Sequence, residues 1–228
     1  MPKTMRTADE WYGEFRIMPS LAAHQRRVAA VACSIIDAAE RGTPVGDDLH
    51  RNRREIVSAC LLHDMGNILK FDLSYFPDFL EPEGMAYWES VQAEFADRYG
   101  TDEHEATLAI AREIGVSDRT FGYINAVGFR MATGTLAGRD PGKMLCCYAD
   151  MRVAPFGIVT LDERFDEGTK RYAERSRRVA DPEYAMRQVA AIREMESFIF
   201  ADTSISPDGI TDASCKKYFF SLGSFQVA

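Results

Sequence analysis

The residues of this chain with the clearest chemistry are a histidine and an aspartate side by side, His63 and Asp64. They follow the apolar run at residues 59–62 and precede a glycine, Gly66. An imidazole and a carboxylate presented together at the end of a buried helix suit a divalent cation, because they supply a nitrogen and an oxygen ligand. The alternative is a hydrogen bond between the two side chains that only fixes the end of the helix. Further ligands on buried helix faces would favour the metal site.

Three other polar side chains are predicted to lie on the inward faces of helices. His24 lies within an apolar stripe of a predicted helix over residues 19–40, and Asp150 lies on the apolar side of a predicted helix over residues 142–153. A buried aspartate is costly unless something pairs with it. His104 lies in the first turn of another predicted helix, where the helix dipole favours a neutral imidazole. Taken alone, a histidine on such a face is more often a packing residue than a ligand.

The elements that position these side chains are predicted to be helices, because apolar residues recur every three or four positions and alternating patterns are scarce. Residues 53–65 form a predicted helix that is apolar on nearly all sides and therefore central, with His63 and Asp64 at its end. Gly66 is predicted to cap that helix in the left-handed conformation. Residues 67–83 are predicted to form a packed loop next to the pair.

The predicted domain organisation is one helical domain with two flanking segments. The helical domain covers residues 18–200, residues 1–17 pack on it, and residues 201–228 form a C-terminal appendage. Residues 43–52 are predicted to be a polar loop that exposes His50.

The composition excludes several classes of protein. The chain has 228 residues, of which 46% are hydrophobic and 27% charged, an ordinary globular balance. Its formal net charge is −8 and no basic stripe is visible, so stable binding to duplex nucleic acid is not expected. No signal peptide or membrane span is recognised, and the five cysteines fit reduced packing residues. We therefore expect a cytoplasmic protein with no membrane partner, and a homodimer is left open.

The order of these residues resembles that of the HD-domain superfamily of metal-dependent phosphohydrolases. The pattern H…HD…D is met by His24, His63-Asp64 and Asp150, over roughly residues 18–160. The resemblance implies an all-α, HD-domain-like helical bundle around a buried metal site. It also implies hydrolysis of a phosphomonoester, phosphodiester or anhydride by a metal-bound water. The implied substrate is a nucleotide or a similar small phosphorylated metabolite.

The sequence departs from this superfamily at two positions. Members with two metals carry two further histidines, and His104 resembles the first, but residues 125–129 contain no histidine where the second is expected. Many members carry a lysine directly after His-Asp-x-Gly, whereas this chain has Asn67 there and its nearest lysine is Lys70. We therefore expect one metal ion rather than two, with His104 as a second-site ligand or a phosphate contact.

The predicted metal ligands are two imidazoles and two carboxylates, from His24, His63, Asp64 and Asp150. This mixed set suits Mn²⁺, Fe²⁺, Co²⁺, Ni²⁺ or Zn²⁺, whereas Mg²⁺ is less suited to imidazole. A bound ion of this kind lowers the pKa of its water and polarises a phosphoryl oxygen, so Asp64 would serve catalysis as well as binding.

Positive side chains are needed where negative charge develops at phosphorus. The candidates are Lys70, Arg27 and Arg152, although each could instead form a surface salt bridge. Two other functions are left open by the sequence. One is a regulatory module that binds a nucleotide or a metal without turnover, and the other is a structural helical domain whose His-Asp pair is inert.

Overall fold

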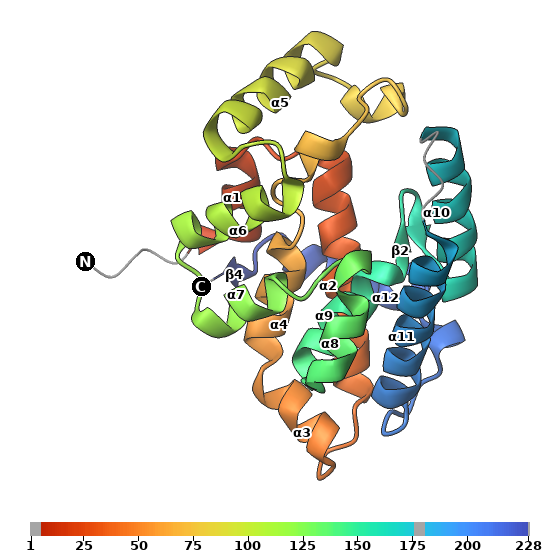
Figure 1. The fold of residues 1–228 in the computed structure, drawn as a ribbon. Coiled ribbons are helices and arrows are strands. Elements are labelled where there is room, and N and C mark those ends of the chain that lie inside the picture. Colours follow the sequence, from red (N-terminus) through yellow and green to blue (C-terminus); the bar gives the residue numbers. More distant parts are fainter. Residues whose placement is uncertain (1–5, 176–180, 228) are drawn as a thin grey trace.

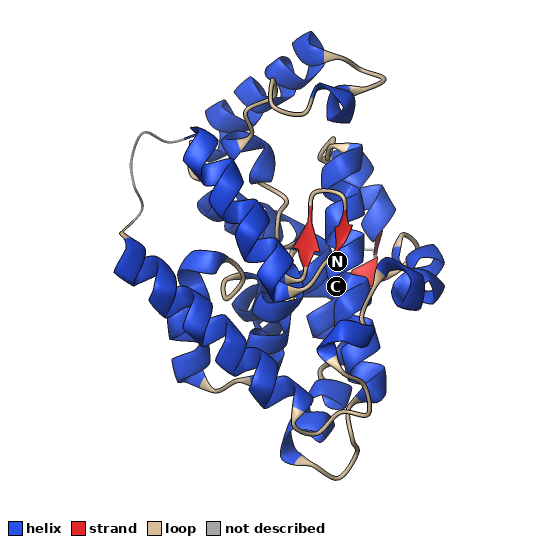
Figure 2. Ribbon diagram, turned by 90° about the vertical axis from the view of Figure 1, so that its right-hand side faces the viewer, coloured by secondary structure: helices blue, strands red, loops and turns tan. Residues whose placement is uncertain are grey.

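A computed structural model describes residues 6–175 and 181–227 of the chain. This part is built almost entirely from helices, which confirms the all-α fold class (Figure 1; Figure 2). The α-helices are α1 (Ala8–Glu14), α2 (Pro19–Ala38), α3 (Pro44–Arg51), α4 (Arg53–Leu62), α5 (Met85–Tyr99), α6 (Glu103–Ile114), α7 (Asp118–Ile124), α8 (Ala132–Gly138), α9 (Pro141–Met151), α10 (Leu161–Arg175), α11 (Pro182–Phe200) and α12 (Asp212–Leu222). The short elements are the 3₁₀ helices η1 (Asn67–Lys70), η2 (Pro77–Leu80), η3 (Phe129–Met131) and η4 (Pro207–Gly209), and the strands β1 (Arg6–Thr7), β2 (Val153–Ala154), β3 (Gly157–Ile158) and β4 (Gln226–Val227).

The central helix of the bundle is α2, which packs against α4, α9 and α12 (Figure 1). Its apolar stripe is fully buried at Val28, Val31 and Ile35, as the spacing of three and four residues predicts. Proline at the first helical position starts α2, and the same signal starts α9 and α11. Proline therefore marks the start of each of these three helices.

The C-terminal residues pack onto this central helix. Helix α12 buries Cys215 and Leu222, and β4 pairs with β1 so that Val227 lies opposite Arg6. The two strands bring the first and last described segments of the chain together, and Figure 2 shows the helices in blue around the short red strands. Residues 1–5 and 228 of the two predicted flanking segments lie outside the described residues. None of the described helices is long and apolar enough to cross a membrane.

The prediction of a polar loop at residues 43–52 is wrong, because this segment forms α3. Thr43 caps the helix by accepting the Gly46 N–H, and Pro44 follows at the first helical position. His50 is only partly exposed, and one of its ring nitrogens lies 3.0 Å from the carbonyl oxygen of Ala39. The cap and the proline were the signal for a helix, which the polar composition obscured.

Gly66 does not adopt the predicted left-handed conformation. Its backbone has φ −93° and ψ 0°, which any residue can adopt. The glycine is required by close packing instead, because a Cβ atom there would lie 2.5 Å from the carbonyl oxygen of Glu103 and 2.8 Å from the amide nitrogen of Thr107. The turn after His63 and Asp64 therefore rests directly on the start of α6.

We expect Gly66→Ala to lower the free energy of unfolding by about 1–3 kcal/mol, because the added methyl group overlaps backbone atoms that cannot move independently. Gly134→Ala is the matched control, since a Cβ there meets no atom within 4 Å and alanine favours helix. Urea unfolding of both variants measures the difference. Equal stability of the two variants would contradict the close contact.

Candidate metal centre

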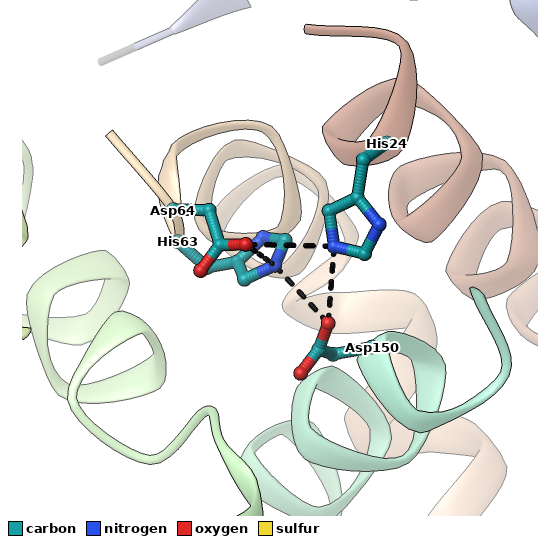
Figure 3. Close-up of side chains that lie close together, drawn as sticks. All are labelled: His24, His63, Asp64 and Asp150. Atoms are coloured by element: carbon teal, nitrogen blue, oxygen red, sulfur yellow. Dashed lines mark hydrogen bonds and ion pairs between the residues drawn. The ribbon is translucent and has the colours of Figure 1, made fainter. Parts of the chain in front are cut away.

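Four side chains from three separate segments of the chain meet in the core of the bundle (Figure 3). His24 comes from α2, His63 and Asp64 follow the end of α4, and Asp150 comes from α9. One ligand atom from each of the four residues can be chosen so that all lie within 4.8 Å of one another. The structure thus brings together the residues that the sequence predicts as ligands.

The separations between these atoms suit a shared ion. His24 Nε2 lies 3.1 Å from Asp150 Oδ1 and 3.5 Å from Asp64 Oδ2. His63 Nε2 lies 3.4 Å from Asp150 Oδ1 and 3.6 Å from Asp64 Oδ2. Nitrogen and oxygen ligands at about 2.0–2.2 Å from one cation lie roughly 3–4 Å from each other. The spacing of the four atoms therefore fits a group that could hold one divalent ion.

The orientation of His63 supports this interpretation. The residue is only 4% exposed, and its Nδ1 lies 2.8 Å from the carbonyl oxygen of Cys60. A carbonyl oxygen only accepts, so Nδ1 carries a hydrogen, and Nε2 can present a lone pair to a cation once it is deprotonated. Among the described residues, this buried nitrogen forms no hydrogen bond, and the carboxylates of Asp64 and Asp150 lie 3.6 and 3.4 Å from it. A backbone carbonyl that accepts from the other ring nitrogen is the usual support of a metal-binding histidine.

The charges in the cluster shift the pKa values of its members. Burial lowers the pKa of His63, but the negative charges of Asp64 and Asp150 outweigh it and raise that pKa to about 10. Burial raises the pKa of Asp150, but its contacts with His24 and His63 hold that pKa well below the usual range. In the absence of a cation, a proton on His63 therefore offsets one of the two carboxylate charges.

We expect binding of a metal ion to release about one proton per chain at pH 8, because the ion must replace the proton on His63. Calorimetric titration with Mn²⁺ in two buffers of different ionisation enthalpy measures this number. A binding heat that does not depend on the buffer would contradict the protonated state of His63.

Gln25 is a buried residue of the site that the sequence analysis missed. Its side-chain carbonyl accepts the backbone N–H of Asp64 at 3.3 Å, and the residue is fully buried between α2 and the turn. It follows His24 directly on the same helix. The apolar stripe predicted for that helix included His24 and left out Gln25.

Arg152 directs its side-chain hydrogen bonds to groups outside the cluster, which gives no support to its predicted role in stabilising charge there. The residue is 1% exposed, and its guanidinium donates to the carbonyl oxygens of Val159, Pro207 and Ile210 and to the hydroxyl of Tyr148. These acceptors join α9 to the β2–β3 hairpin and to the C-terminal segment. Arg152 therefore stabilises the fold.

The two other predicted cations form ion pairs outside the cluster. Arg27 Nε lies 3.1 Å from Asp212 Oδ1, and Lys70 Nζ lies 3.9 Å from Glu103 Oε1. Both side chains remain partly exposed, and the ion pair of each is formed with a residue outside the group of four ligands. Their predicted part in catalysis stays a prediction.

His104 lies outside the group of four ligands. Its Nε2 is 3.0 Å from the side-chain oxygen of Asn125, a residue in the segment where a second-metal histidine was expected. An amide oxygen binds transition metals more weakly than imidazole. The pair is therefore consistent with one strong metal site.

Comparison of the chain with protein-family models, with curated proteins and with solved structures gave no match. The described structure is a helical bundle with a buried group of two histidines and two aspartates that could hold a metal ion, which is compatible with an HD-like site.

Proposed function

We propose that this protein is a metal-dependent phosphohydrolase that acts on a small phosphorylated metabolite, with nucleotides as the first class to test. The observation that carries the proposal is the buried cluster of two imidazole nitrogens and two carboxylate oxygens within 4.8 Å. The preference for nucleotides comes from the resemblance to the HD-domain superfamily alone.

The proposed roles follow from the positions of the side chains. His24, His63, Asp64 and Asp150 would hold the ion. One divalent ion there would polarise a phosphoryl oxygen and lower the pKa of water. The Cys60 carbonyl fixes the ring of His63, and the Gln25 side chain fixes the backbone of Asp64, so the ligand set is held in place before substrate arrives.

The activity is tested by phosphate release from a panel of nucleotides and sugar phosphates. Each substrate is incubated with the protein and Mn²⁺, Co²⁺ or Ni²⁺, and a parallel reaction contains a chelator. We expect release from at least one class of substrate that depends on the added metal. Absence of release from the entire panel with a metal-loaded protein would contradict the proposal.

A second candidate is a module that binds a phosphorylated ligand without turnover. It is favoured by Asn67, which is buried at the position where many HD-domain proteins carry a lysine. Such a module would show thermal stabilisation by a nucleotide in the presence of metal, without any release of phosphate.

A further inference from the structure

We propose that Gln25 is a positioning residue of the metal centre, and that its side-chain amide holds Asp64 at two points when an ion is bound. The amide oxygen accepts the backbone N–H of Asp64, and the amide nitrogen donates to the carboxylate oxygen of Asp64 that does not face the histidines. The inference rests on the metal centre of the proposed function, and it is independent of the reaction that occurs there.

The buried amide of Gln25 uses only one of its two ends. Gln25 is fully buried, and its Oε1 lies 3.3 Å from the backbone nitrogen of Asp64. A backbone N–H only donates, so the amide oxygen faces Asp64 and the amino group is the remaining end. Within the part of the chain that the structure describes, Nε2 is buried without a hydrogen-bond partner. A buried donor is costly to leave unpaired, so we expect an acceptor beside it in the metal-loaded protein.

The carboxylate of Asp64 supplies such an acceptor. Its Oδ2 faces the histidines, 3.5 Å from His24 Nε2 and 3.6 Å from His63 Nε2. Figure 3 shows the other carboxylate oxygen pointing away from His24 and Asp150. A carboxylate that binds a metal is itself usually hydrogen-bonded by a neighbouring group. The free oxygen belongs to the residue whose backbone Gln25 already holds.

A second glutamine of this chain makes the complete two-point contact that we propose for Gln25. Gln188, on α11, is buried, and its Oε1 accepts the backbone N–H of Thr133 at 3.0 Å. Its Nε2 donates to the hydroxyl of the same threonine at 3.3 Å. One amide in this fold therefore holds both the backbone N–H and the side-chain oxygen of a single residue. Asp64 offers the same two kinds of group to Gln25.

The contact joins two ligands that come from different helices. Gln25 follows His24 directly on α2, and Asp64 lies after the end of α4. An amide that fixes both the backbone and the carboxylate of Asp64 holds its Oδ2 in position opposite His24. Removal of a group that supports a metal ligand typically weakens metal binding tenfold to a hundredfold, about the effect expected here.

The test measures the Kd for Mn²⁺ by calorimetry and the thermal unfolding of the metal-free protein. Gln25→Met keeps the length of the side chain and removes both polar contacts, so we expect the Kd to rise about tenfold to a hundredfold. Gln188→Met is the matched control, because it removes the same pair of contacts from a buried glutamine outside the group of four ligands. Both variants should lose stability, but the control should bind Mn²⁺ as the unmodified protein does.

Crystals of the unmodified protein grown with Mn²⁺ test the contact without any substitution. We expect Gln25 Nε2 to lie about 2.7–3.2 Å from a carboxylate oxygen of Asp64. The inference is overturned if that nitrogen is bonded to another group, or if the unmodified protein binds no Mn²⁺. It is also overturned if Gln25→Met unfolds at a lower temperature with an unchanged Kd, which is the result for a glutamine that only stabilises the fold.

The outcomes separate this inference from the proposed function. Mn²⁺ affinity that depends on Gln25, in a protein that hydrolyses none of the substrates, would sustain the positioning role and refute the hydrolase. Metal-dependent hydrolysis together with unchanged Mn²⁺ affinity in Gln25→Met would sustain the hydrolase and refute the positioning role.

Discussion

Asp64→Ala is expected to reduce metal-dependent phosphate release by about a thousandfold or more, because the variant loses one of four ligands and the ion supplies several kcal/mol of transition-state stabilisation. The Asp64 carboxylate lies 3.5 Å from His24 Nε2 and 3.6 Å from His63 Nε2, at the centre of the cluster. The bond from its backbone N–H to Gln25 is kept in the variant. The fold should therefore survive while the metal content falls.

The measurement combines phosphate release, bound metal by elemental analysis, and thermal unfolding followed by circular dichroism. Asp97→Asn is the control, because Asp97 is exposed on α5 and its substitution removes one negative charge, as Asp64→Ala does. We expect the control to match the unmodified protein in all three readouts. Full metal content and full activity in Asp64→Ala would refute the assignment of this residue as a ligand.

Arg152→Ala is expected to lower the free energy of unfolding by about 3–5 kcal/mol, because it leaves buried acceptors unsatisfied in three segments of the chain. Urea unfolding measures the loss, and bound Mn²⁺ per folded chain should stay unchanged. Arg187→Ala is the control, since this side chain is exposed and forms an exposed ion pair with Glu183 one turn away, which predicts a change below about 0.5 kcal/mol.

A stabilising role and a catalytic role of Arg152 predict opposite results for Arg152→Ala. If Arg152 stabilises the fold, the variant is less stable, and its folded fraction retains its metal and its activity. The catalytic role predicted from the sequence requires normal stability with lost activity. A stable but inactive Arg152→Ala variant would support the catalytic role and contradict the stabilising one.

Most of the helical framework could be predicted because each helix carries its own signal. The apolar stripe of α2 repeats every three or four residues, and Pro19 marks its start. The same reasoning failed at α3, where a polar composition outweighed the cap at Thr43. It also gave the wrong reason for Gly66, because contact with α6 depends on tertiary packing that a local pattern does not contain.

The candidate ligands could be predicted because each lies on the inward face or at the end of a core helix, and a bundle brings such positions together. The cations could not be assigned in the same way. The acceptors of Arg152 include the carbonyls of Pro207 and Ile210, which lie more than fifty residues further along the chain. Arg130, in η3, meets Glu103, at the start of α6, through tertiary packing that a local pattern does not contain. The sequence does not show in which direction a long, flexible side chain points.

The most direct test of the metal centre is the anomalous difference map of crystals grown with Mn²⁺. We expect one strong peak per chain, within bonding distance of His24, His63, Asp64 and Asp150, with the Nε2 atom of His63 among its ligands. A map with no peak between these four side chains, from crystals of well-folded protein at saturating Mn²⁺, would contradict the account.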